Sequence, residues 1–182
     1  MKIQFMPRHL VFIVCGVLMT VAVTACQSTS APIKTMESVD LPRFMGDWYV
    51  IGNIPTPLET DAYNALEQYA LNDDGTVATT FTFNKGSLDG PVKVYRPKAF
   101  VRENTGNAVW GMQFIWPIKA EYRVMYVDET YQIAVVGRSK RDYLWIMARQ
   151  PQIEAEIYGA LLGMLREQGY DTDKIRQVPH SL

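Results

Sequence analysis

The sequence predicts an all-β fold with one C-terminal α-helix, in which eight antiparallel strands form an up-and-down barrel. Between residues 46 and 149, eight segments carry large apolar side chains in alternation, and this period of two is typical of strands. The segments are joined mostly by short turns, among them Asn72-Asp73-Asp74-Gly75, whose Asp-Gly pair is a strong hairpin signal. Beyond Pro151 the apolar spacing changes to that of a helix.

Residues 1–25 have the pattern of a secretory signal peptide, because Lys2 and Arg8 precede an apolar run from Leu10 to Val23. The alternative is a membrane anchor, but this run is shorter than the roughly 20 residues that a spanning helix needs. The signal ends in Val23-Thr24-Ala25-Cys26, which resembles the box cleaved by the lipoprotein signal peptidase. That resemblance implies that Cys26 starts the mature chain and carries acyl chains that hold it on a membrane.

Removal of residues 1–25 limits the chemistry that the mature chain can perform. Cys15 and His9 are lost, Cys26 is acylated, and His180 lies close to the C-terminus. Catalysis by Ser-His-Asp or Cys-His therefore has no suitable base, and we expect no enzyme of those classes, no metal site and no cofactor. Of the 18 basic residues 16 remain against 19 acidic ones, and a net charge of −3 gives no reason to expect a nucleic acid as partner.

The mature chain divides into a short tether and one domain. Residues 26–40 are rich in Ser, Thr and Pro and are expected to form a flexible tether between lipid and barrel. Residues 41–182 have the size of a single domain with one core.

The C-terminal helix is expected over residues 152–169. Its stripe at helical spacing consists of Ile153, Ile157, Leu161 and Leu165. A single helix after eight strands must lay this stripe on the outside of the sheet, and residues 174–178 are expected to add a short edge strand.

Alternation within the strands predicts which side chains point into the barrel. The inward sets are Ala65, Glu67, Tyr69 and Leu71 in the second strand, Val77, Thr79, Phe81 and Phe83 in the third, Trp110, Met112, Phe114 and Trp116 in the fifth, and Tyr122, Val124 and Tyr126 in the sixth. The first strand is expected over residues 46–54. The fourth, over residues 93–102, has a less plain register.

Three segments in order carry a resemblance to a known family. They are Gly46-x-Trp48, then Tyr122-x-Val124-x-x-x-Asp128-x-x-Tyr131, and finally Tyr143-Leu144-Trp145-Ile146 followed by Arg149. Together they resemble the lipocalin family, and most of all its bacterial outer-membrane lipoprotein branch, over roughly residues 41 to 178. The resemblance implies a barrel that encloses a ligand cavity, and it makes Asp128 and Tyr131 part of the structural motif.

Trp48 and Arg149 are expected to meet at one end of this barrel. Arg149 ends a strongly β-patterned run, where its planar guanidinium can lie over an indole in a cation–π contact worth roughly 0.5–2 kcal/mol. Gly46, Trp48 and Arg149 would then close the far end and touch no ligand. Taken alone, Gly46-x-Trp48 also fits an ordinary buried tryptophan at the start of a strand.

The ligand site is expected among the inward side chains. The candidate residues are Glu67, Tyr69, Phe81, Ala99, Val101, Trp110, Met112, Phe114, Tyr122, Val124, Tyr126 and Trp145. Ala99 and Val101 are placed inward by comparison with the family, which also puts the loop from Pro55 to Tyr63 over the mouth. Packed core is the default for any single apolar residue. Polar groups in the inward sets favour a cavity, because they are costly to bury without partners.

Glu67 has two interpretations. If it points into the cavity, it disfavours a free carboxylate head group and favours a zwitterionic or cationic one. If the twist of the strand carries it to the rim, it is a solvated carboxylate.

The resemblance implies a protein that binds and stores or transports a fatty acid, lysophospholipid or similar lipid. Gln27, in place of an Asp after Cys26, implies sorting to the outer membrane, at its periplasmic face. Two alternatives stay open: a structural or protein-interaction lipoprotein with a filled barrel, and a lipid-modifying enzyme that uses Glu67 or Asp61 as acid or base. The sequence does not determine whether the chain forms a homo-oligomer.

Overall fold

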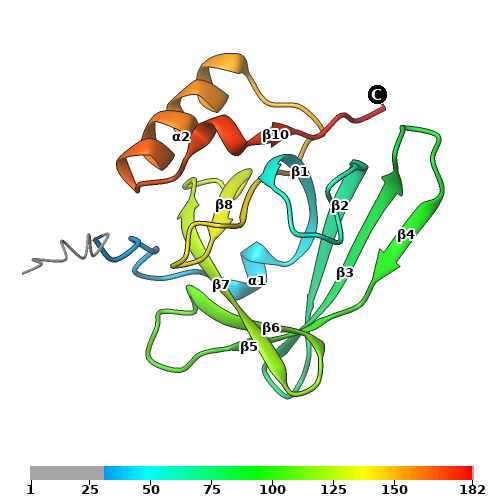
Figure 1. Ribbon diagram of the computed structural model, residues 1–182. Coiled ribbons are helices and arrows are strands. Elements are labelled where there is room, and N and C mark those ends of the chain that lie inside the picture. The colour runs from blue at the N-terminus through cyan, green and yellow to red at the C-terminus, as the bar shows by residue number, and fades with distance from the viewer. Residues whose placement is uncertain (1–30, 182) are drawn as a thin grey trace, which may run out of the picture.

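The computed structural model describes residues 31–181 and contains one antiparallel sheet with two short helices and a longer one (Figure 1). The elements in chain order are α1 (Leu41–Phe44), β1 (Gly46–Ile54), β2 (Ala62–Leu71), β3 (Thr76–Lys85), β4 (Val92–Tyr95), β5 (Lys98–Val101), β6 (Val109–Ile115), β7 (Ile118–Val127), β8 (Ile133–Gly137), β9 (Leu144–Ala148), α2 (Ala155–Glu167), the 3-10 helix η1 (Thr172–Lys174) and β10 (Arg176–Gln177).

The sheet closes into the predicted eight-stranded barrel. Its strands follow the order β1-β2-β3-β5-β6-β7-β8-β9, and β9 pairs back onto β1. Neighbouring strands are mostly consecutive in the chain, which is the up-and-down connection that the short turns predict. The expected edge strand is β10, which pairs with β1 at Gly52 and Asn53.

The predicted fourth strand is two strands in the structure. Arg96 and Pro97 separate β4 from β5, and both strands pair with β3. Proline has no N–H to donate to a sheet ladder, so the strand is interrupted there. The Pro97 carbonyl still accepts a hydrogen bond from the Thr79 N–H at 3.2 Å.

The described part of the expected tether lies against the barrel. Ile33 and Val39 are buried, and the Met36 N–H donates to the carbonyl of Val124 at 2.9 Å. The short helix α1, which the sequence pattern does not predict, then brings the fully buried Phe44 under the barrel. Residues 33–40 are therefore part of the fold rather than a free linker; residues 26–30 and the signal peptide at 1–25 lie outside the described residues.

The predicted contact between Arg149 and Trp48 closes this end of the barrel. The Arg149 guanidinium carbon lies 3.8 Å from the Trp48 ring centroid, which confirms the cation–π contact. Arg149 also donates to the carbonyls of Asp47 at 2.7 Å and of Met45 at 2.8 Å. Gly46 has a φ of +90°, a backbone conformation that side chains disfavour, so a glycine suits the position.

The turn at Asp128 to Tyr131 is tied to the same end. The Asp128 carboxylate accepts from the N–H groups of Gln132 at 2.7 Å and Ile133 at 2.6 Å. The Tyr131 hydroxyl accepts from the N–H of Asp40 at 2.8 Å, and the Tyr131 carbonyl accepts from Arg149 Nε at 3.3 Å. Asp128 therefore fixes the turn, and Tyr131 joins the N-terminal segment to the closed end.

A β-bulge in β7 reverses one predicted orientation. The pairing of β7 with β8 shifts register between Val124 and Tyr126. Because a bulge adds one residue to the alternation, Val124 and Val127 belong to the inner core, whereas Met125 and Tyr126 pack in the outer one. The inward orientation predicted for Tyr126 is therefore wrong.

Two other residues predicted to point inward lie at hairpin ends. Leu71 is the last residue of β2 and is 44% exposed. Trp116 follows the end of β6 and is 82% exposed. Period-two alternation assigns a face but does not show where a strand leaves the barrel wall.

The helix α2 covers the outside of the barrel, as predicted, but on a slightly different stripe (Figure 1). Leu161 and Leu165 are buried in the outer core, with Tyr158 and Leu162 packed beside them. Ile157, which the sequence pattern places on the stripe, is 39% exposed. The observed contacts at 158, 161, 162 and 165 form a continuous i, i+3, i+4, i+7 row, which leaves Ile157 to one side.

Candidate functional site

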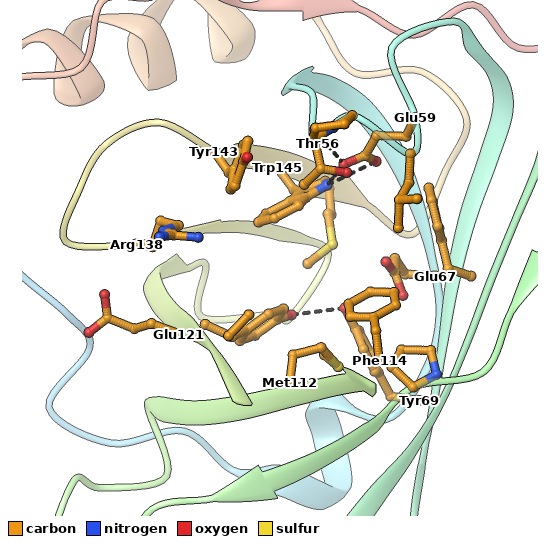
Figure 2. Close-up of a pocket in the computed structure, with 17 residues that line it drawn as sticks. Thr56, Glu59, Glu67, Tyr69, Met112, Phe114, Glu121, Arg138, Tyr143 and Trp145 are labelled. Atoms are coloured by element: carbon orange, nitrogen blue, oxygen red, sulfur yellow. Dashed lines mark hydrogen bonds between the residues drawn. The ribbon is translucent and has the colours of Figure 1, made fainter. Parts of the chain in front are cut away.

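A cavity of about 390 Å³ lies inside the barrel (Figure 2). Its lining includes these residues from the predicted ligand set: Glu67, Tyr69, Phe81, Met112, Phe114, Tyr122 and Trp145. They come from β2, β3, β6, β7 and β9, so the inward side chains of five separate strands line the same cavity. The loop after β1 supplies Thr56 to Glu59 to the same lining and lies over the mouth, as expected.

The remaining predicted ligand residues do not line the cavity. Trp110, Val124 and Ala99 are fully buried in the inner core, and Val101 packs against that core. Trp110 stacks on Tyr122 with ring centroids 4.9 Å apart. These side chains therefore support the cavity wall and fill the closed end, and Tyr126 lies outside the barrel.

Two tyrosines form the polar part of the cavity floor. The hydroxyls of Tyr69 and Tyr122 are 2.9 Å apart and share a hydrogen bond. Phe44 and Trp110 pack against the Tyr69 ring at centroid distances of 5.7 and 5.8 Å. Burial raises the pKa of both tyrosines well above the ordinary value, so both hydroxyls stay neutral.

The overlying loop carries a buried carboxyl that the sequence analysis did not single out. Glu59 is 2% exposed, and both of its carboxyl oxygens accept from the Trp145 Nε1 at 3.2 Å (Figure 2). The Thr56 N–H donates to Glu59 Oε1 at 3.1 Å. Burial is the largest influence and raises the pKa of Glu59, against these hydrogen bonds. Thr56-x-x-Glu59 has the spacing of a capping box, and this signal could have found the residue.

Glu67 points into the cavity, which decides between its two interpretations. It lies on β2 opposite Trp48 of β1 and Phe81 of β3. Its Oε2 is buried and has no hydrogen-bond partner among the described residues. Burial raises the pKa of Glu67 well above its ordinary value, and the nearby Glu59 raises it further.

Charged groups at the rim of the cavity lie near opposite charges, although the buried Arg138 Nε makes no hydrogen bond among the described residues. Arg138 Nε lies 2.9 Å from an oxygen of Asp142. Glu121 accepts from Arg123 Nε at 2.8 Å and from the Ser139 N–H at 2.7 Å. Opposite charges thus lie close together at the rim, whereas Glu67 has no cation beside it in the barrel.

Comparison with known proteins identifies the family. A family model described as a lipocalin-like domain matches residues 39–180. The chain belongs to the lipocalin family. This lipocalin is 30% identical over 161 residues to temperature-induced lipocalin-1 of Arabidopsis thaliana, with 82% of this chain and 83% of the relative covered. It is also 30% identical over 156 residues to the outer membrane lipoprotein Blc of Escherichia coli, with 84% and 86% covered.

The structural comparison agrees with the family. The solved structure of insecticyanin from Manduca sexta matches with a TM-score of 0.65 at 15% identity, and 82% of this chain and 85% of that chain are covered. At that identity the likeness concerns the barrel fold alone.

The cavity of this lipocalin fits binding better than catalysis. Lipocalins are generally binding proteins rather than enzymes. The walls are apolar and aromatic, with a few placed polar groups, which is the usual make-up of a small-molecule site. The family and the cavity together are consistent with a small hydrophobic ligand. Among residues 31–181, no helix has the length and apolarity needed to cross a membrane.

Proposed function

We propose that this lipocalin binds one amphipathic lipid, a fatty acid, a lysophospholipid or a similar single-chain molecule, and stores or transports it. The observation that carries the proposal is the apolar cavity of about 390 Å³ in the barrel, with polar groups at its floor and under its loop. Sites for small ligands are typically about 300–1,000 Å³, so there is room for one chain. Each methylene that leaves water would contribute about 0.8 kcal/mol to binding.

The location that fits this function is the periplasmic face of the outer membrane. Several relatives at 25–30% identity are named outer membrane lipoproteins. The lipobox ending at Cys26 supports the same attachment here, although it lies outside the described residues. Acylated Cys26 would keep the barrel beside the membrane that supplies or receives its lipid.

An exposed apolar hairpin tip beside the cavity supports exchange with that membrane. Ile115, Trp116 and Ile118 are 72%, 82% and 68% exposed at the turn between β6 and β7. Phe114 in the same hairpin lines the cavity and is itself exposed. Tryptophan is favoured at membrane–water interfaces, so this tip would touch the bilayer where a lipid enters the barrel.

Native mass spectrometry tests the binding function. The chain from Gln27 onward suits the experiment, because both hydrophobic cores lie between Ile33 and Val178. We expect a one-to-one adduct with fatty acids or lysophospholipids, and its loss in Ala120→Trp, since Ala120 lines the cavity. Ala160→Trp, on the exposed side of α2, is the matched control and should keep the adduct.

The proposal fails if the wild-type chain takes up none of these lipids. That result would favour a lipoprotein that works through contacts with other proteins. Turnover of a lysophospholipid during the same incubation would favour the enzyme alternative instead, and Glu67→Gln would show whether that carboxyl takes part.

A further inference from the structure

Glu67 differs from the other carboxyls that line the cavity, because one of its oxygens has no hydrogen-bond partner among the described residues. Glu59 accepts hydrogen bonds from Trp145 and Thr56, and Glu121 is paired with Arg123. Among the described residues, nothing donates to Glu67 Oε2, although this oxygen is buried. A buried polar atom without a partner is costly, so such an atom in a binding cavity indicates that the ligand supplies the missing group.

The surroundings of Glu67 are acidic and aromatic. Figure 2 shows Glu67 between Glu59 of the overlying loop and Tyr69 of the floor. The rings of Phe81, Tyr69 and Trp145 line the same space. The cationic side chain in the lining, Arg138, is held at the rim by Asp142. Around Glu67 the interior therefore offers carboxyls and ring faces to a ligand, whereas the cation of the described lining, Arg138, lies at the rim close to Asp142.

We propose that Glu67, assisted by Glu59, makes the cavity select an amphiphile whose head group carries a positive charge, a primary amine or a quaternary ammonium. This specificity rests on the proposed function, because it describes the head group of the same bound lipid. The apolar residues Leu58, Met112 and Phe114 would hold the acyl chain.

The physical basis is the exchange of a proton for a cation. Without a ligand, burial raises the pKa of Glu67 and favours the protonated carboxyl. A cationic head group favours the ionised form, so Glu67 releases its proton to solvent and pairs with the ligand. The ring faces add cation–π attraction. A fatty-acid carboxylate would instead meet Glu59 and Glu67, and like charges at close range disfavour ionisation of all three.

Three probes with the same twelve-carbon chain test this selectivity. Dodecyltrimethylammonium, dodecanol and dodecanoate are titrated calorimetrically, below their micelle-forming concentrations, into the chain from Gln27 onward. We expect the ammonium probe to bind about tenfold or more tightly than dodecanol, and dodecanoate to bind most weakly. In Glu67→Gln the ammonium and dodecanol affinities should become similar. Asp61→Asn, on the same loop as Glu59 but outside the cavity lining, should keep the wild-type order.

Proton release gives a second readout that needs no variant. Titration of the wild-type chain with the ammonium probe in buffers of different ionisation enthalpy should show protons released on binding, and affinity should rise with pH. If dodecanoate binds as tightly as the ammonium probe, or if no proton is released, the inference is wrong while lipid binding stands. If none of the three probes binds, the proposed function itself is wrong.

Discussion

At the scale of single residues, two partly buried ionisable groups have opposite surroundings. Arg149 donates to several backbone carbonyls and lies over Trp48, so its charge is satisfied within the fold. Glu67 has an unpartnered oxygen in an apolar cavity. The first arrangement stabilises the barrel, whereas the second costs stability and is typical of a site kept for a ligand.

Glu67→Gln should therefore stabilise the empty protein at neutral pH. Folding raises the pKa of Glu67 above its ordinary value of 4.5, and the facing groups Glu59, Tyr69 and Tyr122 add no positive charge. Stability from the protonated carboxyl is fully present below 4.5 and is lost as pH rises through the higher folded value. The advantage of the variant should thus be small near pH 4 and grow by up to about 1.4 kcal/mol per pH unit above that.

Urea unfolding at a series of pH values measures this difference. Glu103→Gln, at an exposed carboxyl, is the control and should show no such growth. A constant difference between Glu67→Gln and wild type from pH 4 to pH 8 would contradict the raised pKa.

At the scale of elements, the hairpin of β6 and β7 lies partly in the cavity wall and partly in solvent. Its base contributes Met112, Tyr122 and Ala120 to the cavity, and its tip exposes Trp116. Because the tip lies outside the cavity lining, it can affect the entry of a lipid without affecting the bound state.

Trp116→Ser should slow the uptake of lipid from vesicles. A fluorescent lysophospholipid in phosphatidylcholine vesicles should transfer to the variant several-fold more slowly, because the tip loses its interfacial anchor. The affinity for the same lipid in solution should stay unchanged. Ile157→Ser, an exposed apolar position on α2, is the control. Equal transfer rates for wild type and Trp116→Ser would show that the hairpin tip takes no part in lipid exchange.

At the scale of the whole molecule, the barrel wall separates two cores. The inner core includes Trp48, Phe83 and Trp110, and the outer core lies beneath α2 around Ile146 and Leu165. The cavity lining is drawn from the inner side, so stability supplied by the outer core is separable from ligand binding.

Leu165→Ala should destabilise the fold and leave the binding preference intact. Leu165 is fully buried, and such truncations cost about 2–5 kcal/mol. Ile157→Ala, exposed on the same helix, should cost far less. Denaturant unfolding together with lipid titration of the folded variant checks both parts. A changed order of ligand affinities in Leu165→Ala would show that the two cores are coupled.

Local sequence patterns are sufficient to predict the barrel and much of the cavity. Period-two alternation put Tyr69, Phe81 and Met112 on the inner face, and the Trp48 and Arg149 segments specified the closed end. These features depend on local patterns, since a strand that buries one face must place every second residue there.

The remaining features depend on contacts between segments that are far apart in the chain. The bulge that turns Tyr126 outward follows from how β7 pairs with β8, and no local pattern records that pairing. The burial of Glu59 and the orphaned oxygen of Glu67 depend on a loop that folds over the barrel mouth. A polar residue in a strand can be solvated or enclosed, and only the segments that come from elsewhere in the chain determine which.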